Sequence, residues 1–226
     1  MSAHNSNVPL ELRPFAEGVW TAERPQRFAG VQVGARMTVL ALDGGLLLHS
    51  PIDVPPAALA PLGPPRWVVA PNKLHHLYLA PWIDAGAEAW CAPGLDAKRG
   101  DLTFAGVLDA PGEPFGPEVS VVPLSCIALT NEVVLLHRPS RTLIVTDLLY
   151  NFTPSDPWMT RAALWALGGY PGVRTSLLEK ALMKRDRARR EIDHLLELDF
   201  DRLIMAHGEP LERGGKEALA NAFAWL

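Results

Sequence analysis

Short apolar and β-branched runs, separated by glycine and proline, recur through most of this chain of 226 residues. Runs of this length and composition are typical of buried or half-buried β-strands, and the glycines and prolines between them favour tight turns. The segment 43–45, Asp-Gly-Gly, tolerates a positive φ and predicts a hairpin between the runs on either side of it. The strands predicted from these runs are 18–22, 36–42, 46–49, 66–70, 89–92, 119–122, 132–137, 142–146 and 202–206.

Helical periodicity is concentrated in the last third of the chain. Apolar residues recur at helical spacing over 158–167 and 175–198, and a closing helix is predicted over 216–226 after Gly214-Gly215. Earlier in the chain, the pattern predicts a short helix near 57–60 and another over 73–84. Mixed strands and helices in this order indicate an α+β (α/β) chain whose layers run helix, sheet, sheet, helix.

Composition narrows the class of protein. The chain has 21 Lys and Arg against 25 Asp and Glu, a net charge of −4 with neutral histidines, which excludes a polybasic nucleic-acid binder. Nearly half of the residues are apolar, which is enough for one sizeable domain over residues 1–226. A homo-oligomer is compatible with this composition.

Location is indicated by the two cysteines and by the N-terminus. Cys91 and Cys126 form no C-x-x-C pair and predict a reducing compartment. The first 14 residues lack the pattern of a signal peptide, and no apolar run approaches the ~18–20 residues of a membrane span. We therefore expect a cytoplasmic protein without a membrane partner.

Several side chains able to bind a metal follow predicted strands. His75 and His76 come after the run 66–70, Asp147 comes after 142–146, and His207 comes after 202–206. Residues at the carboxyl ends of several strands can converge on one crevice. Neutral imidazoles with one carboxylate suit zinc or iron, so a site with three nitrogens and one oxygen is chemically sensible.

At these positions the sequence resembles the metallo-β-lactamase fold superfamily and, within it, a domain-of-unknown-function branch. The resemblance implies a four-layer αββα sandwich and a hydrolase-like activity, although the superfamily hosts hydrolytic and redox reactions alike. Four local matches in the expected order carry it, and they are Arg36–Val39, Leu47–Ile52, His137–Asp147 and Asp199–Gly208.

The superfamily's metal motif, H-x-H-x-D-H, is degenerate in this chain. The matching segment is 71–76, where Pro71 and Lys73 replace the first two histidines and His75 replaces the aspartate. Only His76 matches outright, and no histidine lies between Cys126 and Thr130, where the resemblance implies another ligand. The residues that match by position, together with the substituted His75, are His75, His76, Asp147 and His207, which could hold at most one ion.

Two interpretations of this remnant remain open. In the first, the four residues bind one zinc or iron ion. In the second, no metal binds, and the ammonium of Lys73 pairs with Asp147 as the cation that a buried carboxylate requires. His49 and Ser50, at the end of the run 46–49, either line the same crevice or make a structural hydrogen bond.

Each interpretation predicts a function. The first predicts a mononuclear, metal-dependent hydrolase-like protein that acts on a small molecule. The second predicts a non-catalytic protein whose crevice binds a small anionic ligand or a partner, with Lys73 capturing the anion. Among the other residues, we expect His137 to be exposed, and Trp82 and Trp158 to lie nearest the opening of the crevice.

Overall fold

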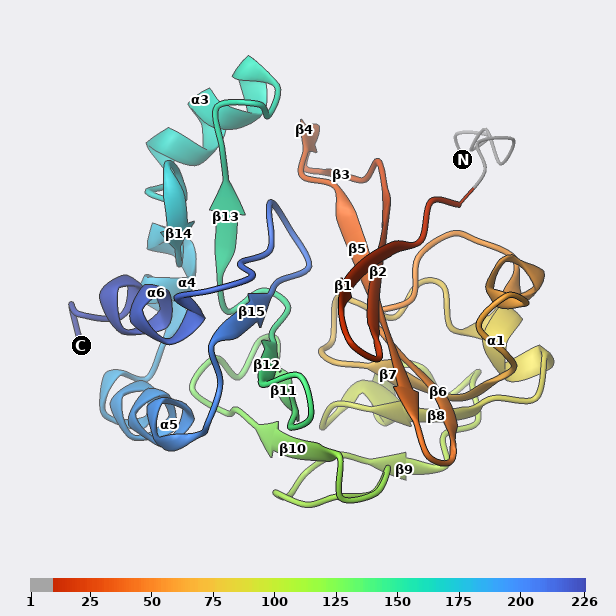
Figure 1. Ribbon diagram of the computed structural model, residues 1–226. Helices are drawn as coiled ribbons and strands as arrows, with labels where there is room; N and C mark the ends of the chain where they lie inside the picture. Colours follow the sequence, from red (N-terminus) through yellow and green to blue (C-terminus); the bar gives the residue numbers. More distant parts are fainter. Residues whose placement is uncertain (1–9) are drawn as a thin grey trace.

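Two β-sheets pack face to face in the computed structural model, and helices cover their outer faces (Figure 1). The structure describes residues 10–226, so most of the segment tested above for a signal peptide lies outside the described residues. In Figure 1, helices α5 and α6 lie on one side of the sheets and α1 lies on the other.

The first sheet has seven strands in the order β1-β2-β5-β6-β7-β8-β9. Neighbouring strands are antiparallel from β1 to β6 and parallel from β6 to β9. The predicted hairpin joins β5 to β6, where Leu42 pairs with Gly45, whose φ is 129°. The strands are β1 Arg13–Ala16, β2 Val19–Arg24, β5 Ala35–Leu42, β6 Gly45–His49, β7 Pro65–Ala70, β8 Glu88–Cys91 and β9 Gly106–Val107.

The second sheet has four strands in the order β10-β11-β12-β15. Strands β10 to β12 form an antiparallel meander, and β15 returns parallel to β12 after the long helical segment. These strands are β10 Val119–Pro123, β11 Val133–His137, β12 Thr142–Ile144 and β15 Arg202–Ile204. Two small ribbons complete the strands, β3 Arg27–Phe28 with β4 Val31–Gln32, and β13 Tyr150–Phe152 with β14 Gly172–Arg174.

The helices differ from the sequence prediction in several places. Helix α2, Leu95–Lys98, is not among the predicted helices, and the closing helix ends at Ala222 and not at residue 226. The predicted helix over 175–198 is two helices, because Met183 has extended backbone and the N–H of Lys184 donates to Cys126 O instead of continuing the helix. The predicted helix over 73–84 keeps only its last five residues. The helical elements are the 3₁₀ turn η1 Pro56–Leu59, α1 Ala80–Asp84, α2 Leu95–Lys98, α3 Trp158–Ala166, α4 Leu177–Leu182, α5 Arg185–Glu197 and α6 Gly215–Ala222.

Three hydrophobic cores correspond to the three spaces between four layers. Side chains alternate across a strand, and on β6 Leu47 packs between the sheets while Leu46 and Leu48 pack under the outer helices. On β11, Leu135 lies in the same inter-sheet core, and Val134 packs on the other face with α5 and α6. The layers therefore run helix, sheet, sheet, helix.

Two expectations about single residues are wrong. His137 is 1% exposed, because it ends β11 inside the second sheet. Trp82, which was expected near the opening of the crevice, is fully buried in α1 and packs in the core between that helix and the first sheet. Trp158 is 70% exposed. Within the described residues, none of the helices is both long and apolar enough to cross a membrane.

Candidate metal centre

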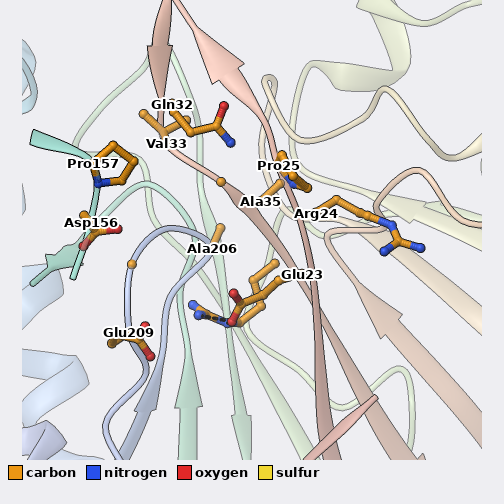
Figure 2. A pocket seen from close by; sticks show the side chains of 13 residues that line it. Glu23, Arg24, Pro25, Gln32, Val33, Ala35, Asp156, Pro157, Ala206 and Glu209 are labelled. Atoms are coloured by element: carbon orange, nitrogen blue, oxygen red, sulfur yellow. Dashed lines mark hydrogen bonds and ion pairs between the residues drawn. The ribbon is translucent and has the colours of Figure 1, made fainter. Parts of the chain in front are cut away.

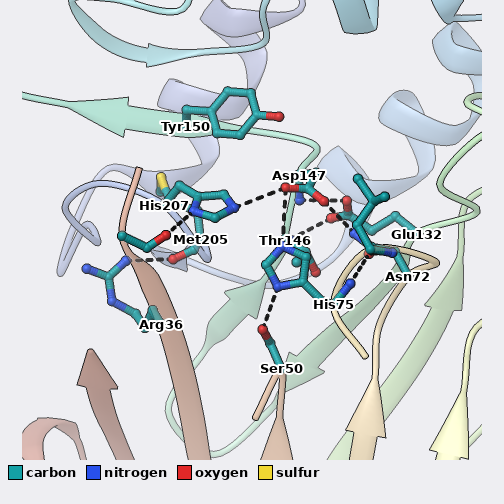
Figure 3. Close-up of polar contacts among 12 residues, drawn as sticks. Arg36, Ser50, Asn72, His75, Glu132, Thr146, Asp147, Tyr150, Met205 and His207 are labelled. Atoms are coloured by element: carbon teal, nitrogen blue, oxygen red, sulfur yellow. Dashed lines mark hydrogen bonds and ion pairs between the residues drawn. The ribbon is translucent and has the colours of Figure 1, made fainter. Parts of the chain in front are cut away.

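Three strand ends bring His75, Asp147 and His207 together (Figure 3). His75 follows β7, Asp147 follows β12 and His207 follows β15. Both histidines turn Nε2 toward the same carboxylate oxygen, and Asp147 Oδ1 lies 3.4 Å from His75 Nε2 and 3.3 Å from His207 Nε2. One potential ligand atom of each residue lies within 4.8 Å of the others, so the three form a group that can hold a metal ion.

The partners of the two rings fix their orientation. His207 Nδ1 lies 2.7 Å from the carbonyl oxygen of Gly34, which can only accept, so Nδ1 carries the proton and Nε2 presents a lone pair in the neutral ring. His75 Nδ1 lies 2.8 Å from the hydroxyl of Ser50. A second ring nitrogen bonded in this way is typical of metal-ligating histidines.

The electrostatics of the group call for a cation. Burial by itself raises the pKa of the Asp147 carboxyl, but the His75 and His207 rings outweigh burial and hold that pKa well below its ordinary value. An imidazole nitrogen that faces a carboxylate oxygen needs a proton or a metal ion between them, and Asp147 Oδ1 faces two such nitrogens. The donor set therefore fits a divalent ion.

Asn72 connects two of the three ligand-bearing turns. Its Nδ2 donates to Asp147 Oδ2 at 2.7 Å, which leaves Oδ1 for the histidines. Its Oδ1 accepts the backbone N–H groups of Leu74 and His75 at 2.8 and 2.9 Å. Asn72 is fully buried, and these three bonds hold the His75 loop against the Asp147 turn.

Glu132 supports the same turn from below. Its carboxylate accepts the backbone N–H groups of Thr146 and Asp147 at 2.6 and 2.8 Å. Burial, and then the nearby charge of Asp147, raise the pKa of Glu132 to about 8. Sequence analysis missed both Asn72 and Glu132. The one available signal was a single carboxylate directly before the apolar run of β11.

The structure does not place His76 or Lys73 in the group. His76 Nδ1 lies 3.0 Å from Arg99 Nη1, and the His76 ring is not part of the group formed by His75, Asp147 and His207. Lys73 Nζ donates to Ala128 O at 3.2 Å and is not paired with Asp147, whose polar partners are Asn72 and the two histidines. The expectation of Lys73 as the surrogate cation is therefore wrong.

The other two predicted residues lie beside the group. Ser50, with a φ of 56°, holds His75, as described above. His49 is 2% exposed, and its Nε2 has no hydrogen-bond partner in the described part of the chain. Burial, and then the charge of His75, lower the pKa of His49 to about 3, so this ring stays neutral at physiological pH.

A cavity of about 270 Å³ opens next to the loop that carries His207, although none of His75, Asp147 and His207 lines it (Figure 2). Ala206 and Gly208, the two neighbours of His207 in the chain, line it together with Gly34. Arg36, also in its wall, is 3% exposed and donates to Met205 O at 2.6 Å, so it connects β5 with the loop that carries His207. The charged lining residues are Glu23, Arg24, Arg36, Asp156 and Glu209.

Solved structures share this architecture across nearly the whole chain. A metallo-beta-lactamase from Pontibacter korlensis superposes with a TM-score of 0.67, covering 95% of this chain and 99% of its own at 12% identity. The metallo-beta-lactamase FIM-1 from Pseudomonas aeruginosa in its mono-zinc form superposes with a TM-score of 0.66, covering 97% of each chain at 13% identity. This chain has the metallo-β-lactamase fold. The predicted αββα sandwich is thereby confirmed.

Sequence comparison adds nothing to this result, since no protein-family model and no curated protein matches the chain. A metallo-β-lactamase from Erythrobacter litoralis with beta mercaptoethanol in its active site superposes equally well, with a TM-score of 0.66 at 12% identity over 96% of this chain and 97% of its own. At such low identities the similarity establishes the metallo-β-lactamase fold and not an activity.

Proposed function

We propose that this protein is a metal-dependent hydrolase-like enzyme with one zinc ion held by His75, Asp147 and His207. The observation that carries the proposal is the convergence of two Nε2 atoms on one carboxylate oxygen, at 3.4 and 3.3 Å. We further propose, as the sequence predicts, that the substrate is a small molecule.

Two of the three separations among the ligand atoms have the value expected for a tetrahedral zinc ion. Ligands on a tetrahedral zinc ion with bonds of about 2.0–2.1 Å lie about 3.3–3.4 Å apart. Right angles between neighbouring ligands at the same bond length give separations of about 2.9 Å. The two separations at Asp147 Oδ1 match the tetrahedral value.

Within residues 10–226 the group offers three ligands, and this number favours catalysis over a structural role. Structural zinc sites are closed by four protein ligands, whereas catalytic sites have three and keep one position open. When bound, zinc would supply a Lewis acid that makes water acidic enough to act as a nucleophile near neutral pH.

The surrounding residues orient the group and limit its exposure. Gly34 O and Ser50 hold the two rings, and Asn72 directs one carboxylate oxygen toward them. The ring of Tyr150 lies beside that of His207 (Figure 3), with 5.9 Å between the ring centroids. The Tyr150 hydroxyl donates to Glu179 at 3.0 Å. Tyr150 thus lies against one side of the His207 ring, and its own proton is bound by Glu179.

Metal analysis on the purified protein tests the proposal. We expect one zinc ion per chain, and we expect His75→Ala and His207→Ala each to weaken zinc binding by more than ~100-fold, since even second-shell changes cost 10–100-fold. His76→Ala and His194→Ala are the matched controls, because neither ring belongs to the group.

Activity is then measured on the zinc-loaded protein with ester, thioester, lactone and phosphoester probes. Hydrolysis of at least one probe that is lost in both His75→Ala and His207→Ala supports the enzyme. Stoichiometric zinc without any hydrolysis would restrict the proposal to metal binding. Failure of the parent to bind zinc would overturn it and favour a non-catalytic protein of this fold.

A further inference from the structure

Helix α3 presents an apolar face to solvent. Its inner face packs through Thr160 and Leu164, which are buried. Its outer face bears no charge, and only the half-buried Arg161 borders it. Trp158, Met159 and Trp165 are 70%, 63% and 71% exposed. The exposed positions of the helix are Trp158, Met159, Ala162, Trp165 and Ala166.

A helix that is apolar on all sides is normally buried. With nine residues, α3 is far shorter than the ~20 residues that span a bilayer. In Figure 1 it lies at the end of the molecule, beyond the two sheets, so no other part of the described chain covers its outer face. Contact with something outside the described chain is the remaining way to remove this face from water.

The apolar area continues from α3 onto α4. Leu167, Leu177 and Leu178 are 47%, 56% and 53% exposed, and the N–H of Leu177 donates to Leu167 O at 2.7 Å. We define the α3–α4 apolar surface by its six large side chains, which are Trp158, Met159, Trp165, Leu167, Leu177 and Leu178.

The size of this surface is that of a protein–protein interface. The two tryptophans alone expose roughly 200–350 Å², given ~150–250 Å² for a whole aromatic side chain. The six side chains together expose on the order of 700 Å², close to the ~800 Å² that each partner contributes to a standard interface. The largest apolar patch on a typical monomer is ~300–600 Å².

We infer that the α3–α4 apolar surface joins two copies of this chain about a two-fold axis near Ala162. Trp158, Ala162 and Trp165 lie at i, i+4 and i+7 and form one stripe along the helix. The stripe reads large, small, large in both directions. In an antiparallel arrangement the two copies of Ala162 meet at the crossing, where their small side chains let the helices approach closely, and tryptophans lie on either side.

Helix α3 lacks the charged face of a membrane-surface helix. Helices that lie on membranes carry a strongly charged face, rich in Lys and Arg, opposite their apolar face. In α3 the one charged residue is Arg161, and the face opposite the exposed one packs on the protein through Thr160 and Leu164. In α4, Glu179 and Lys180 offset each other. This inference is independent of the proposed metal centre.

Sedimentation equilibrium on the full-length protein tests the contact. We expect the parent to have twice the mass of the chain at micromolar concentration. The double variant Trp158→Glu/Trp165→Glu should be monomeric, with the dimer dissociation constant raised by ~100-fold or more, because buried charge replaces two aromatic anchors in each copy. Leu129→Glu, at a side chain that is 61% exposed in another loop, should remain dimeric.

Cysteine cross-linking tests the geometry. Under mild oxidation, Ala162→Cys should form a covalent dimer much faster than Ala224→Cys, which places a thiol on a different exposed part of the chain. The two natural cysteines are buried and do not interfere. A monomeric parent, a dimer that survives the double variant, or equal cross-linking rates would overturn the inference. Sedimentation of a monomeric parent with phospholipid vesicles would assign the surface to lipid and overturn it as well.

Discussion

His137 illustrates how burial alone sets the behaviour of a single residue. Its Nδ1 lies 2.7 Å from Ser140 Oγ, and its Nε2 has no hydrogen-bond partner in the described part of the chain. Burial lowers the pKa of this ring, and the opposing charge of Glu118 offsets the effect only in part. The folded protein therefore holds His137 neutral at a pH where the unfolded chain would protonate it.

This difference in the His137 pKa between the folded and unfolded chain predicts that acid lowers the free energy of unfolding. Because the pKa is lower in the folded state, the unfolded chain binds the proton first as the pH falls below ~6.5, and the free energy of unfolding drops by up to ~1.4 kcal/mol per pH unit. Urea unfolding of the parent and His137→Gln at pH ~7.5 and ~5.5 measures it. The variant should lose less stability on acidification, whereas His194→Gln, on the exposed face of α5, should behave as the parent does. Equal losses in parent and His137→Gln would contradict the prediction.

At the scale of elements, the loop between β7 and α1 shows a side chain preventing a helix. The apolar spacing over 73–84 predicts a helix, but Asn72 Oδ1 accepts the N–H groups of Leu74 and His75 and holds the loop in a different conformation. Leu74 and Leu77 consequently face solvent, at 42% and 60% exposure. The same bonds direct His75 toward Asp147 and His207.

Removal of the Asn72 amide should therefore affect metal binding more than an ordinary loop change does. We expect Asn72→Ala to weaken zinc binding by ~10–100-fold, the usual effect of losing a second-shell partner. The free energy of unfolding should fall by about 1–3 kcal/mol, because Asp147 and two N–H groups lose a partner. Chelator competition and urea unfolding measure the two effects, with the exposed Asn221→Ala as control. Unchanged zinc affinity in folded Asn72→Ala would show that the amide only stabilises the loop.

At the scale of the whole molecule, the placement of His75, Asp147 and His207 relative to one another depends on contacts between the two sheets. Asp147 and His207 come from the second sheet and His75 from the first, and His207 is held by Gly34 at the start of β5. Arg36 crosses the same boundary, since it binds Glu23 on β2 and Met205 O on the loop after β15. The relative placement of the sheets thus sets the distance between the two imidazoles.

Arg36→Met should loosen this connection. We expect zinc affinity to fall by ~10-fold, because the Met205–His207 loop loses one of its anchors to the first sheet. The buried Met205 carbonyl loses its donor, which should lower the free energy of unfolding by about 1–3 kcal/mol. Arg13→Met removes a comparable but exposed ion pair with Glu11 and should change neither quantity. A variant as stable and as zinc-avid as the parent would show that the sheets hold His207 without Arg36.

The sequence by itself determined the positions of most strands, because strand formation follows from apolar runs and their turns, which are local properties. It also predicted that Asp147 and His207 follow strands and lie in one crevice, since the end of a strand is local as well. The expected four layers followed from the order of these elements.

Only the tertiary structure decided which of two adjacent histidines faces the site. His75 and His76 are adjacent in the chain, and the hydrogen bond from Ser50 to His75 fixes which ring faces Asp147. Asn72 holds the same loop against Asp147, which lies 75 residues away from it in the chain. The break between α4 and α5 has the same kind of cause, a bond from Lys184 to Cys126. Such outcomes depend on hydrogen bonds between distant segments, and those bonds exist only once the two sheets have packed.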